Sequence, residues 1–363
     1  MIDVSALNKI LAASMRDFAS ARQLVSAKEI QRCLGLDPLP PRTELEASTS
    51  PLCESHGVTI ESVLFHSRPN WPVPALHFQT SDGGPLVVFL SGVWSDGKAS
   101  PAVQAFGISL ALAGYGVLAL EPPGIWNALA QTERFAHGDA RNRELCMATP
   151  PLGAYVWDCV RALDWAGSTE VAIVGHQLGA EAAMLAFALD QRFKCAAFSG
   201  AGGSLEKVEK LTPSWSGLPG IGQCGDICDI VGVAGDKPVL FLACEEDSTQ
   251  AISSIERTVE KLNKTRKQGP ARLETFIGPS DFNRRMRETT IGFLKETFGG
   301  KPSKYVYETV PLTDGFVRTS EAGTMLPSTL PVIGDSAENS AKYGGAPTAT
   351  FEELNFQALS EPY

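Results

Sequence analysis

The sequence has few histidines, and all of them lie in its first half. The five are His56, His66, His77, His137 and His176, in a chain of 363 residues. A basic surplus is also missing, because 41 acidic residues exceed 31 lysines and arginines and give a formal charge of -10. With no such surplus to neutralise phosphates, the composition argues against nucleic-acid binding.

Long apolar runs are absent as well. Charged residues interrupt the segment 1–22, and no stretch approaches the ~20 apolar residues that span a bilayer. We therefore expect a cytoplasmic protein that does not associate with membranes, although a secreted chain trimmed of its signal would show the same pattern. A weakly acidic surface is the ordinary state of a soluble protein, and we favour this interpretation of the charge over a special partner.

The eight cysteines lack the spacing of a metal site. Three residues separate Cys224 from Cys228, but no second cysteine or histidine pair follows them. Cys159, Cys195 and Cys244 fall in apolar patterns, where cysteine behaves as a small hydrophobic residue. We expect no metal and no cofactor, and we favour a loop over a metal or redox role for Cys224 and Cys228.

From residue 85 onward, short apolar segments alternate with longer helical patterns, which indicates a mostly parallel sheet covered by helices on both faces. We predict an N-terminal helical segment (1–40), an α/β domain (41–300) and an irregular C-terminal extension (301–363). Long loops at 122–151 and 202–237 are expected to form the site. Strands are predicted at 58–66, 73–79, 86–90, 115–120, 171–174, 193–198, 238–244 and 272–277, and helices within 5–34 and at 103–113, 152–166, 178–185, 252–262 and 284–298.

The segment Gly175-His176-Gln177-Leu178-Gly179 joins a predicted strand to a predicted helix. A G-x-S-x-G sequence in this context is a sharp turn that lifts a nucleophile into the active site. Here the central residue is Gln177, whose carboxamide cannot form an acyl intermediate. The turn is therefore predicted without its usual nucleophile.

Residues 36–40, 91–99, 155–164 and 189–193 surround this turn in an order and spacing that resemble the acetyl xylan esterase and cephalosporin-C deacetylase branch of the α/β-hydrolase superfamily. The resemblance covers roughly residues 36–298 and implies an α/β-hydrolase fold with the chain order nucleophile, acid, histidine. It places Gln177 at the nucleophile position, Asp247 at the acid position and Ser280 at the histidine position. Serine chemistry needs an adjacent base, so the resemblance implies that both nucleophile and base are missing.

The resemblance also implies an oxyanion hole made of backbone N–H groups, from Leu178 and from the loop of Gly92, Val93 and Trp94. Trp94 and Trp126 suit the wall of a sugar-binding pocket, although both also suit plain packing. An equally favoured interpretation is that the glycines remain only because the turn requires them.

Four other side chains have two interpretations each. His176 is expected to be a hydrogen-bonded structural residue rather than a catalytic one. His137 is a possible substitute base, with a solvated loop residue as the favoured alternative. Asp247 is either a working carboxylate or, as we favour, a residue hydrogen-bonded to Ser280 or Gln177. Glu181 is expected to face solvent.

The leading prediction is a pseudo-hydrolase that binds a small acylated or sugar-like ligand or a protein partner. The first alternative is an active enzyme on the same scaffold. It would be a lyase, isomerase or cyclase that uses the oxyanion hole and an Asp or His proton shuttle, or a residual carboxylesterase. The second alternative is a structural subunit that docks through its terminal segments. The sequence leaves the oligomeric state open.

Overall fold

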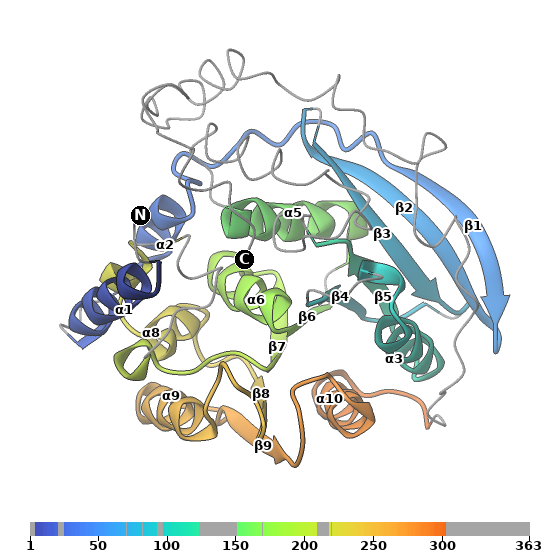
Figure 1. The fold of residues 1–363 in the computed structure, drawn as a ribbon. Helices are drawn as coiled ribbons and strands as arrows, with labels where there is room; N and C mark the ends of the chain where they lie inside the picture. Colours follow the sequence, from blue (N-terminus) through green and yellow to red (C-terminus); the bar gives the residue numbers. More distant parts are fainter. Residues whose placement is uncertain are drawn as a thin grey trace.

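A nine-stranded sheet forms the centre of the molecule in the computed structural model, which describes residues 4–20, 25–69, 71–81, 83–92, 97–122, 151–168, 170–208, 218 and 220–302. Its spatial order is β1-β2-β3-β5-β4-β6-β7-β8-β9 (Figure 1). The strands are β1 (Ser48–Ser55), β2 (Val58–Arg68), β3 (Trp71–Gln79), β4 (Leu86–Leu90), β5 (Gly116–Leu120), β6 (Val171–His176), β7 (Phe193–Ser199), β8 (Val239–Cys244) and β9 (Arg272–Phe276).

The six strands β4 to β9 run parallel to one another, whereas β1, β2 and β3 form an antiparallel extension at one edge. Strand β4 lies between β5 and β6, with Leu90 opposite both Leu120 and Gly175. Every residue of β4, β6 and β8 is buried, as expected for strands covered on both faces. The predicted mostly parallel sheet is confirmed, and the carboxyl ends of its strands meet along one edge.

Helices cover both faces of the sheet and bury a separate apolar cluster on each. Helices α5, α6, α8 and α9 lie on one face together with the N-terminal helices, and α3 and α10 lie on the other (Figure 1). The helices are α1 (Val4–Ser20), α2 (Ala27–Cys33), α3 (Pro101–Leu112), α5 (Pro151–Ala166), α6 (Leu178–Leu189), α8 (Ile227–Gly232), α9 (Ile252–Thr265) and α10 (Arg284–Phe298), with short 3-10 turns η1 (Gly97–Ala99), η2 (Leu205–Lys207) and η3 (Ile221–Cys224).

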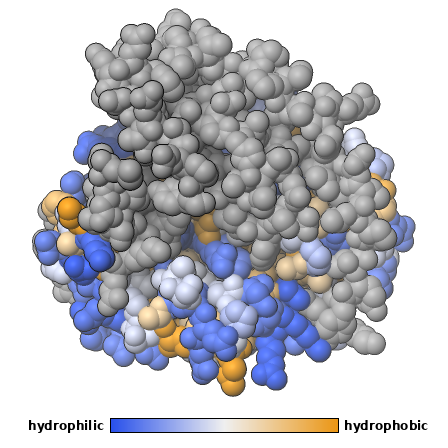
Figure 2. All heavy atoms as spheres, in the orientation of Figure 1, coloured by the Kyte–Doolittle hydropathy of each residue, from blue (hydrophilic) through white to orange (hydrophobic). Residues whose placement is uncertain are grey.

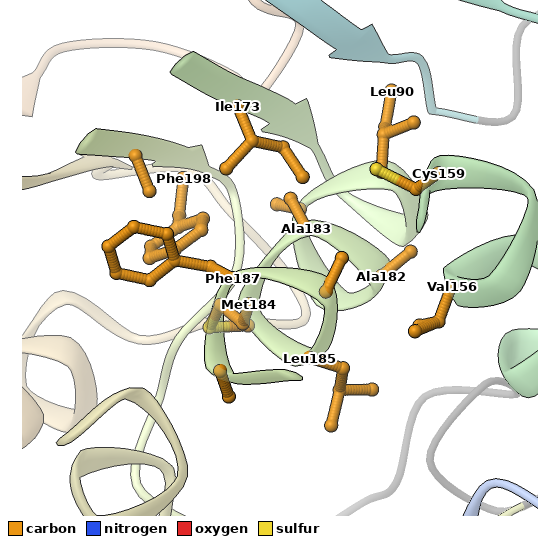
Figure 3. Packing of buried hydrophobic residues seen from close by; sticks show 14 of the residues in the cluster. Leu90, Val156, Cys159, Ile173, Ala182, Ala183, Met184, Leu185, Phe187 and Phe198 are labelled. Carbon is orange, nitrogen blue, oxygen red and sulfur yellow. The ribbon is translucent and has the colours of Figure 1, made fainter. Parts of the chain in front are cut away.

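Helix α6 is enclosed by α2, α5 and α8, which all contact it, and its residues 178–188 are all buried. Figure 3 shows Met184, Leu185 and Phe187 on different sides of α6, with Phe187 beside Phe198 of β7. The enclosure extends to Glu181, which is only 3% exposed. Our expectation that Glu181 faces solvent is therefore wrong. Its place in the first turn of α6 favours a carboxylate, since the helix dipole is positive there.

The N-terminal helices pack against the same face. Met15 of α1 and Ile30 of α2 belong to the larger apolar cluster. The guanidinium of Arg16 donates to the carbonyl oxygen of Val208 at 2.6 Å. Helix α2 begins at a capping box in which Ser26 and Glu29 satisfy each other's backbone N–H groups. These contacts hold α1 and α2 onto the face that carries α6.

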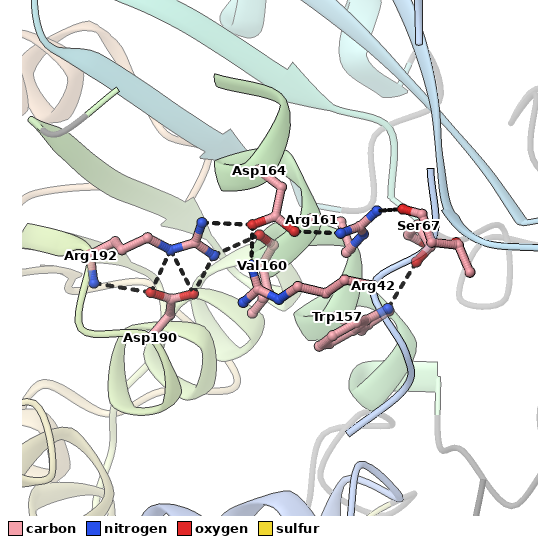
Figure 4. A network of polar contacts seen from close by, with 9 residues as sticks. Arg42, Ser67, Trp157, Val160, Arg161, Asp164, Asp190 and Arg192 are labelled. Atoms are coloured by element: carbon pink, nitrogen blue, oxygen red, sulfur yellow. Dashed lines mark hydrogen bonds and ion pairs between the residues drawn. The ribbon is translucent and has the colours of Figure 1, made fainter. Parts of the chain in front are cut away.

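A network of charged groups ties α5 to the end of α6 (Figure 4). Asp164 of α5 accepts from Arg192 at 2.7 Å and from Arg161 at 2.5 Å, and it also pairs with Arg42. Arg192 in turn binds both carboxylate oxygens of Asp190. Two stretches that carried the family resemblance, 155–164 and 189–193, therefore meet in one ion-pair network. This network fixes the helix that leads to the Gln177 turn against the helix that follows it.

The surface of the described part is mixed in polarity. Figure 2 shows hydrophilic residues interspersed with smaller hydrophobic groups over the part of one face that the structure describes. Within the described ranges, no helix has the length and apolar character that crossing a bilayer requires.

Candidate functional site

Gln177 stands at the tip of a sharp turn between β6 and α6, as predicted. Its backbone has φ 49° and ψ -116°, a left-handed conformation that side-chain-bearing residues rarely adopt. The turn is held by the Gln177 N–H, which donates to the carbonyl oxygen of Ser199 on the neighbouring strand at 2.7 Å. Strain of this kind, about 1–3 kcal/mol, persists only where the surroundings enforce it.

Two glycines allow β6 and α6 to approach closely at this turn. A Cβ atom on Gly175 would lie 2.3 Å from the carbonyl oxygen of Gly179. A Cβ atom on Gly179 would lie 2.0 Å from the carbonyl oxygen of Leu90 in β4. Both distances are shorter than any real contact, so the packing of the helix against two strands requires these glycines.

The Gln177 side chain bridges two loops at the carboxyl edge of the sheet. Its Nε2 donates to the carbonyl oxygen of Ser280 at 3.1 Å, in the loop that follows β9. Its Oε1 lies on the side of Gly92, where an added Cβ would stand 3.3 Å away. The carboxamide therefore contacts the segment in which the resemblance places a histidine and faces the segment in which it places an oxyanion hole.

Asp247 and Ser280 lie beside this turn. A Cβ atom on Gly200 would stand 2.4 Å from Ser280 Oγ, 3.4 Å from Gln177 Cγ and 3.5 Å from Asp247 Oδ2, so the three side chains surround one point. The Oδ1 atom of Asp247 accepts hydrogen bonds from the N–H and hydroxyl of Thr249 and from the N–H of Gln250. The structure thus brings together the three positions that are far apart in the sequence.

The hydrogen bond that we expected from Asp247 to Ser280 or Gln177 does not form among the described residues. Asp247 Oδ1 instead accepts from the N–H of Thr249 in the turn that follows it. The side-chain amide of Gln177 donates to the carbonyl oxygen of Ser280 rather than to a carboxylate. Asp247 Oδ2 and Ser280 Oγ are both buried atoms without a hydrogen-bond partner in the described part of the chain. An acceptor and a hydroxyl of this kind suit a ligand group that can donate a hydrogen bond.

Backbone donors are available beside Gln177. Leu178 and Gly179 open helix α6, and the first N–H groups of a helix have no intrahelical acceptor. The Gln177 side chain does not cap them. Gly92 is buried next to His176 and Gln177. The other candidates named from the sequence, which are His137, Val93, Trp94 and Trp126, lie outside the described residues.

His176 lies under the turn and is fully buried. Its Nδ1 is 3.0 Å from Ser199 Oγ, and its ring stacks on Phe282 at a centroid distance of 5.5 Å. Burial, together with the nearby positive charge of Arg287, lowers the pKa of His176 from 6.5 to about 3. The ring is therefore neutral near pH 7 and serves structure, as predicted.

This depressed pKa makes acid sensitivity an expected property. Unfolding lets His176 take up a proton below its ordinary pKa, whereas the folded protein does not, so the stability from this group is complete above pH 6.5 and falls as the pH drops toward 3. We expect a loss of about 1.4 kcal/mol per pH unit over that window. Urea unfolding of the natural chain and of His176→Asn at pH 7 and pH 5.5 checks this. An equally steep loss in the variant would assign the acid sensitivity to other groups.

Sequence reasoning missed the residues that end β7. Ser199 holds both the Gln177 backbone and the His176 ring, and Gly200, with φ 65°, leaves the space into which Ser280 projects. A signal was present, because Ser199-Gly200 follows a predicted strand at the same sheet edge. Ser199 and Gly200 match no catalytic pattern, so this signal alone did not identify them as site residues.

A separate hollow of about 190 Å³ lies at the opposite edge of the sheet, by the first residues of β4 and β5. Its lining includes His77, Tyr115 and Trp165. Ligands of open α/β sheets bind beyond the carboxyl ends of the strands, so we place the site at Gln177 rather than in this hollow. Within the described ranges, no cluster of histidine, cysteine or carboxylate groups is arranged to hold a metal ion.

Solved structures share this overall fold. Methylesterase BT1017 aligns with a TM-score of 0.68 and 16% identity, over 98% of this chain and 76% of its own. A glucuronoyl esterase from Solibacter usitatus aligns with a TM-score of 0.57 and 14% identity, over 75% of this chain and 92% of its own. An acetyl xylan esterase from Paenibacillus sp. R4 gives 0.56 and 14%, over 79% and 99%.

The chain has an α/β-hydrolase fold. The sequence matches no protein-family model and no curated protein, and identities of this size extend to the fold alone. Within an α/β-hydrolase fold, the turn after β6 is the place where a nucleophile is presented. Gln177 therefore occupies the position at which such a fold presents its nucleophile, between Asp247 and Ser280 on one side and Gly92 on the other.

Proposed function

We propose that this protein is a pseudo-hydrolase, an esterase-type scaffold that binds a small acylated or sugar-like ligand without cleaving it by serine chemistry. The observation that carries the proposal is the position of Gln177. A carboxamide at the tip of the turn has no nucleophilic atom comparable to a serine, cysteine or aspartate oxygen or sulfur. Such a protein would bind a ligand at the usual place in this fold but would not form a covalent intermediate with it.

The electrostatic character of the site supports ligand binding. Ser280 Oγ and Asp247 Oδ2 offer a hydroxyl and an acceptor around one point, and the backbone N–H of Leu178, the residue after Gln177, is available at the start of α6. Leaving buried polar atoms unpaired costs about 1–3 kcal/mol each, which a ligand hydroxyl would recover. The structurally similar proteins are named as a methylesterase, a glucuronoyl esterase and an acetyl xylan esterase. We therefore favour an acylated or uronic sugar as the ligand class.

The second candidate function is catalysis without a serine. It is favoured by Asp247, whose Oδ2 is buried and lacks a hydrogen-bond partner among the described residues. A carboxylate in that state can accept a proton from a ligand whose carbonyl is polarised by backbone N–H groups. Such a site would support a lyase, isomerase or cyclase step, or slow hydrolysis by an activated water.

Ester hydrolysis tests the proposal directly. The natural chain and Gln177→Ala are incubated with a panel of acetyl, methyl and uronoyl esters, and release of acid or alcohol is measured. We expect both proteins to stay at the buffer rate, because neither has a nucleophile at position 177. Turnover by the natural chain that is lost in Gln177→Ala would refute the pseudo-hydrolase and give Gln177 a catalytic role.

Ligand binding is measured on the same two proteins by calorimetry with acylated mono- and oligosaccharides. A matched control is Asp247→Asn, which keeps the shape of the side chain and removes its charge. Binding that weakens at least about tenfold in Asp247→Asn would place the ligand at this site, since a hydrogen bond to a charged group is worth about 1.5–3 kcal/mol. If the natural chain and Asp247→Asn bound a ligand equally well, that ligand would bind elsewhere.

A further inference from the structure

Two thiols from distant parts of the chain meet where the N-terminal helices pack onto the domain. Cys33 is the last residue of α2, and Cys224 is the last residue of η3. Their Sγ atoms lie 3.3 Å apart although 191 positions separate them in the sequence. Cys33 Sγ also lies 3.3 Å from the carbonyl oxygen of Gly220. The fold alone creates this pair.

The local geometry leaves room for the two sulfur atoms to come closer. A disulfide holds its sulfur atoms about 2.05 Å apart, so the pair needs an approach of roughly one ångström, which side-chain rotation can supply. Gly220 has no side chain at this point, and an added Cβ there would only just touch Cys33 Sγ, at 3.4 Å. Cys33 is half-buried, whereas Cys224 is 2% exposed. An attacking reagent therefore reaches Cys33 first.

The electrostatic setting separates Cys33 from the other cysteines that the structure describes. The hydrogen bond from Cys224 lowers the pKa of Cys33. Burial raises the pKa of Cys228 and of Cys195, each to about 12. A lower pKa increases the fraction of thiolate, which is the reactive form. Among the described cysteines, the most reactive thiol thus lies next to a second thiol.

We propose that Cys33 and Cys224 are a redox-active pair that forms a reversible disulfide with a low-molecular-weight disulfide, such as oxidised glutathione, as the oxidant. The Cys33 thiolate attacks one sulfur of the small disulfide, whose S–S bond breaks and releases one small thiol. Cys224 then loses its proton and attacks Cys33 Sγ, which releases the second small thiol. The two protein thiols lose two protons and two electrons, and both are recovered in the two small thiols.

The bond would tie the N-terminal helices to the body of the protein. Helix α2 contacts α6, the helix that begins directly after Gln177. Closing a loop of this length removes much conformational freedom from the unfolded chain, so the oxidised form is the more stable one. Oxidation would thus set how firmly α2 stays docked against the helix that carries the candidate site.

Thiol mapping of the full-length protein tests this proposal. The protein is equilibrated in glutathione buffers of graded redox poise, free thiols are blocked, and peptides are analysed without reduction. We expect a cross-linked peptide pair containing Cys33 and Cys224, and a rise in melting temperature of about 5 °C that a dithiol reductant reverses. Failure to detect that pair in the most oxidising buffer would overturn the proposal.

Serine variants provide the control. Cys33→Ser and Cys224→Ser should each lose the cross-link and the temperature shift, whereas Cys228→Ser, four residues along, should retain both. A link between Cys224 and Cys228, or glutathione held on Cys33 without the second step, would also contradict the proposal. Peptide mapping needs only the natural chain, so the test stands if the buried Cys224→Ser variant fails to fold.

Discussion

Replacing Gln177 by serine and Ser280 by histidine together is expected to create ester hydrolysis about 100-fold above the natural chain, since a positioned general base contributes at least that much. The two positions already meet: the Gln177 amide donates to the Ser280 backbone, and Asp247 Oδ2 lies beside both side chains. A histidine at 280 would stand between a serine and a carboxylate, which is the order that serine activation requires. Initial rates on a short-chain acyl ester measure the effect.

The single variants are the controls for this experiment. Gln177→Ser alone lacks a base, and Ser280→His alone lacks a nucleophile, so each should remain at the rate of the natural chain. Adding Asp247→Asn to the double variant should remove most of the gain. An inactive double variant that is folded, by circular dichroism and melting temperature, would show that these positions do not form a triad geometry.

Gly179→Ala is expected to destabilise the protein by about 3 kcal/mol, the upper part of the range for overpacking a tight core. The added methyl group would lie 2.0 Å from the carbonyl oxygen of Leu90, which is backbone and cannot rotate away. Helix α6 would have to move off β4, although alanine is otherwise the better helix former. Urea unfolding of the natural chain and the variant measures the difference.

Gly292→Ala is the matched control for that substitution. Gly292 lies inside α10, and a Cβ added there meets nothing within 4 Å. Its replacement should stabilise the protein by about 0.5–1 kcal/mol, because the unfolded chain loses freedom and the helix loses none of its contacts. If both variants were destabilised equally, a general intolerance of substitution, rather than the close approach of α6 and β4, would explain the result.

The parallel part of the fold could be predicted from the sequence because its segments are unambiguous. The strand at 86–90 and the helix at 284–298 have the predicted bounds, since β4 is a continuous buried run and α10 starts at the capping residue Asn283 and ends at Gly299. Strand β1 was missed. It is largely exposed, contains Pro51 and has an irregular register there, so it shows no alternating pattern.

The segment 202–237 shows the same limit from the other side. Its glycines and prolines predict an irregular loop, yet it contains η2, η3 and the six-residue helix α8. Helix α8 is too short for periodicity to reveal, and Asp226 holds its start by binding Ser204 at 2.6 Å and Leu205 at 2.7 Å. Such contacts, like the meeting of Cys33 with Cys224, depend on positions that only the fold brings together.

The site was predicted as far as main-chain geometry determines it. The turn at Gln177 was predicted from its glycines between a strand and a helix, whereas Asp247 and Ser280 were placed by the family resemblance. The role of each side chain did not follow, because a hydrogen bond depends on which of several nearby partners a group selects. Asp247 binds its own turn at Thr249, and Gln177 binds a backbone oxygen rather than a carboxylate.

The turn at Gln177 owes its shape to groups other than the Gln177 side chain. A backbone hydrogen bond to Ser199 and the two glycines hold it. The residue at the tip of the turn can therefore be replaced, and its chemistry changed, while the backbone that presents it keeps its shape. A lineage can lose a reaction here, or acquire a different one, through a few nucleotide changes and without passing through an unfolded intermediate form.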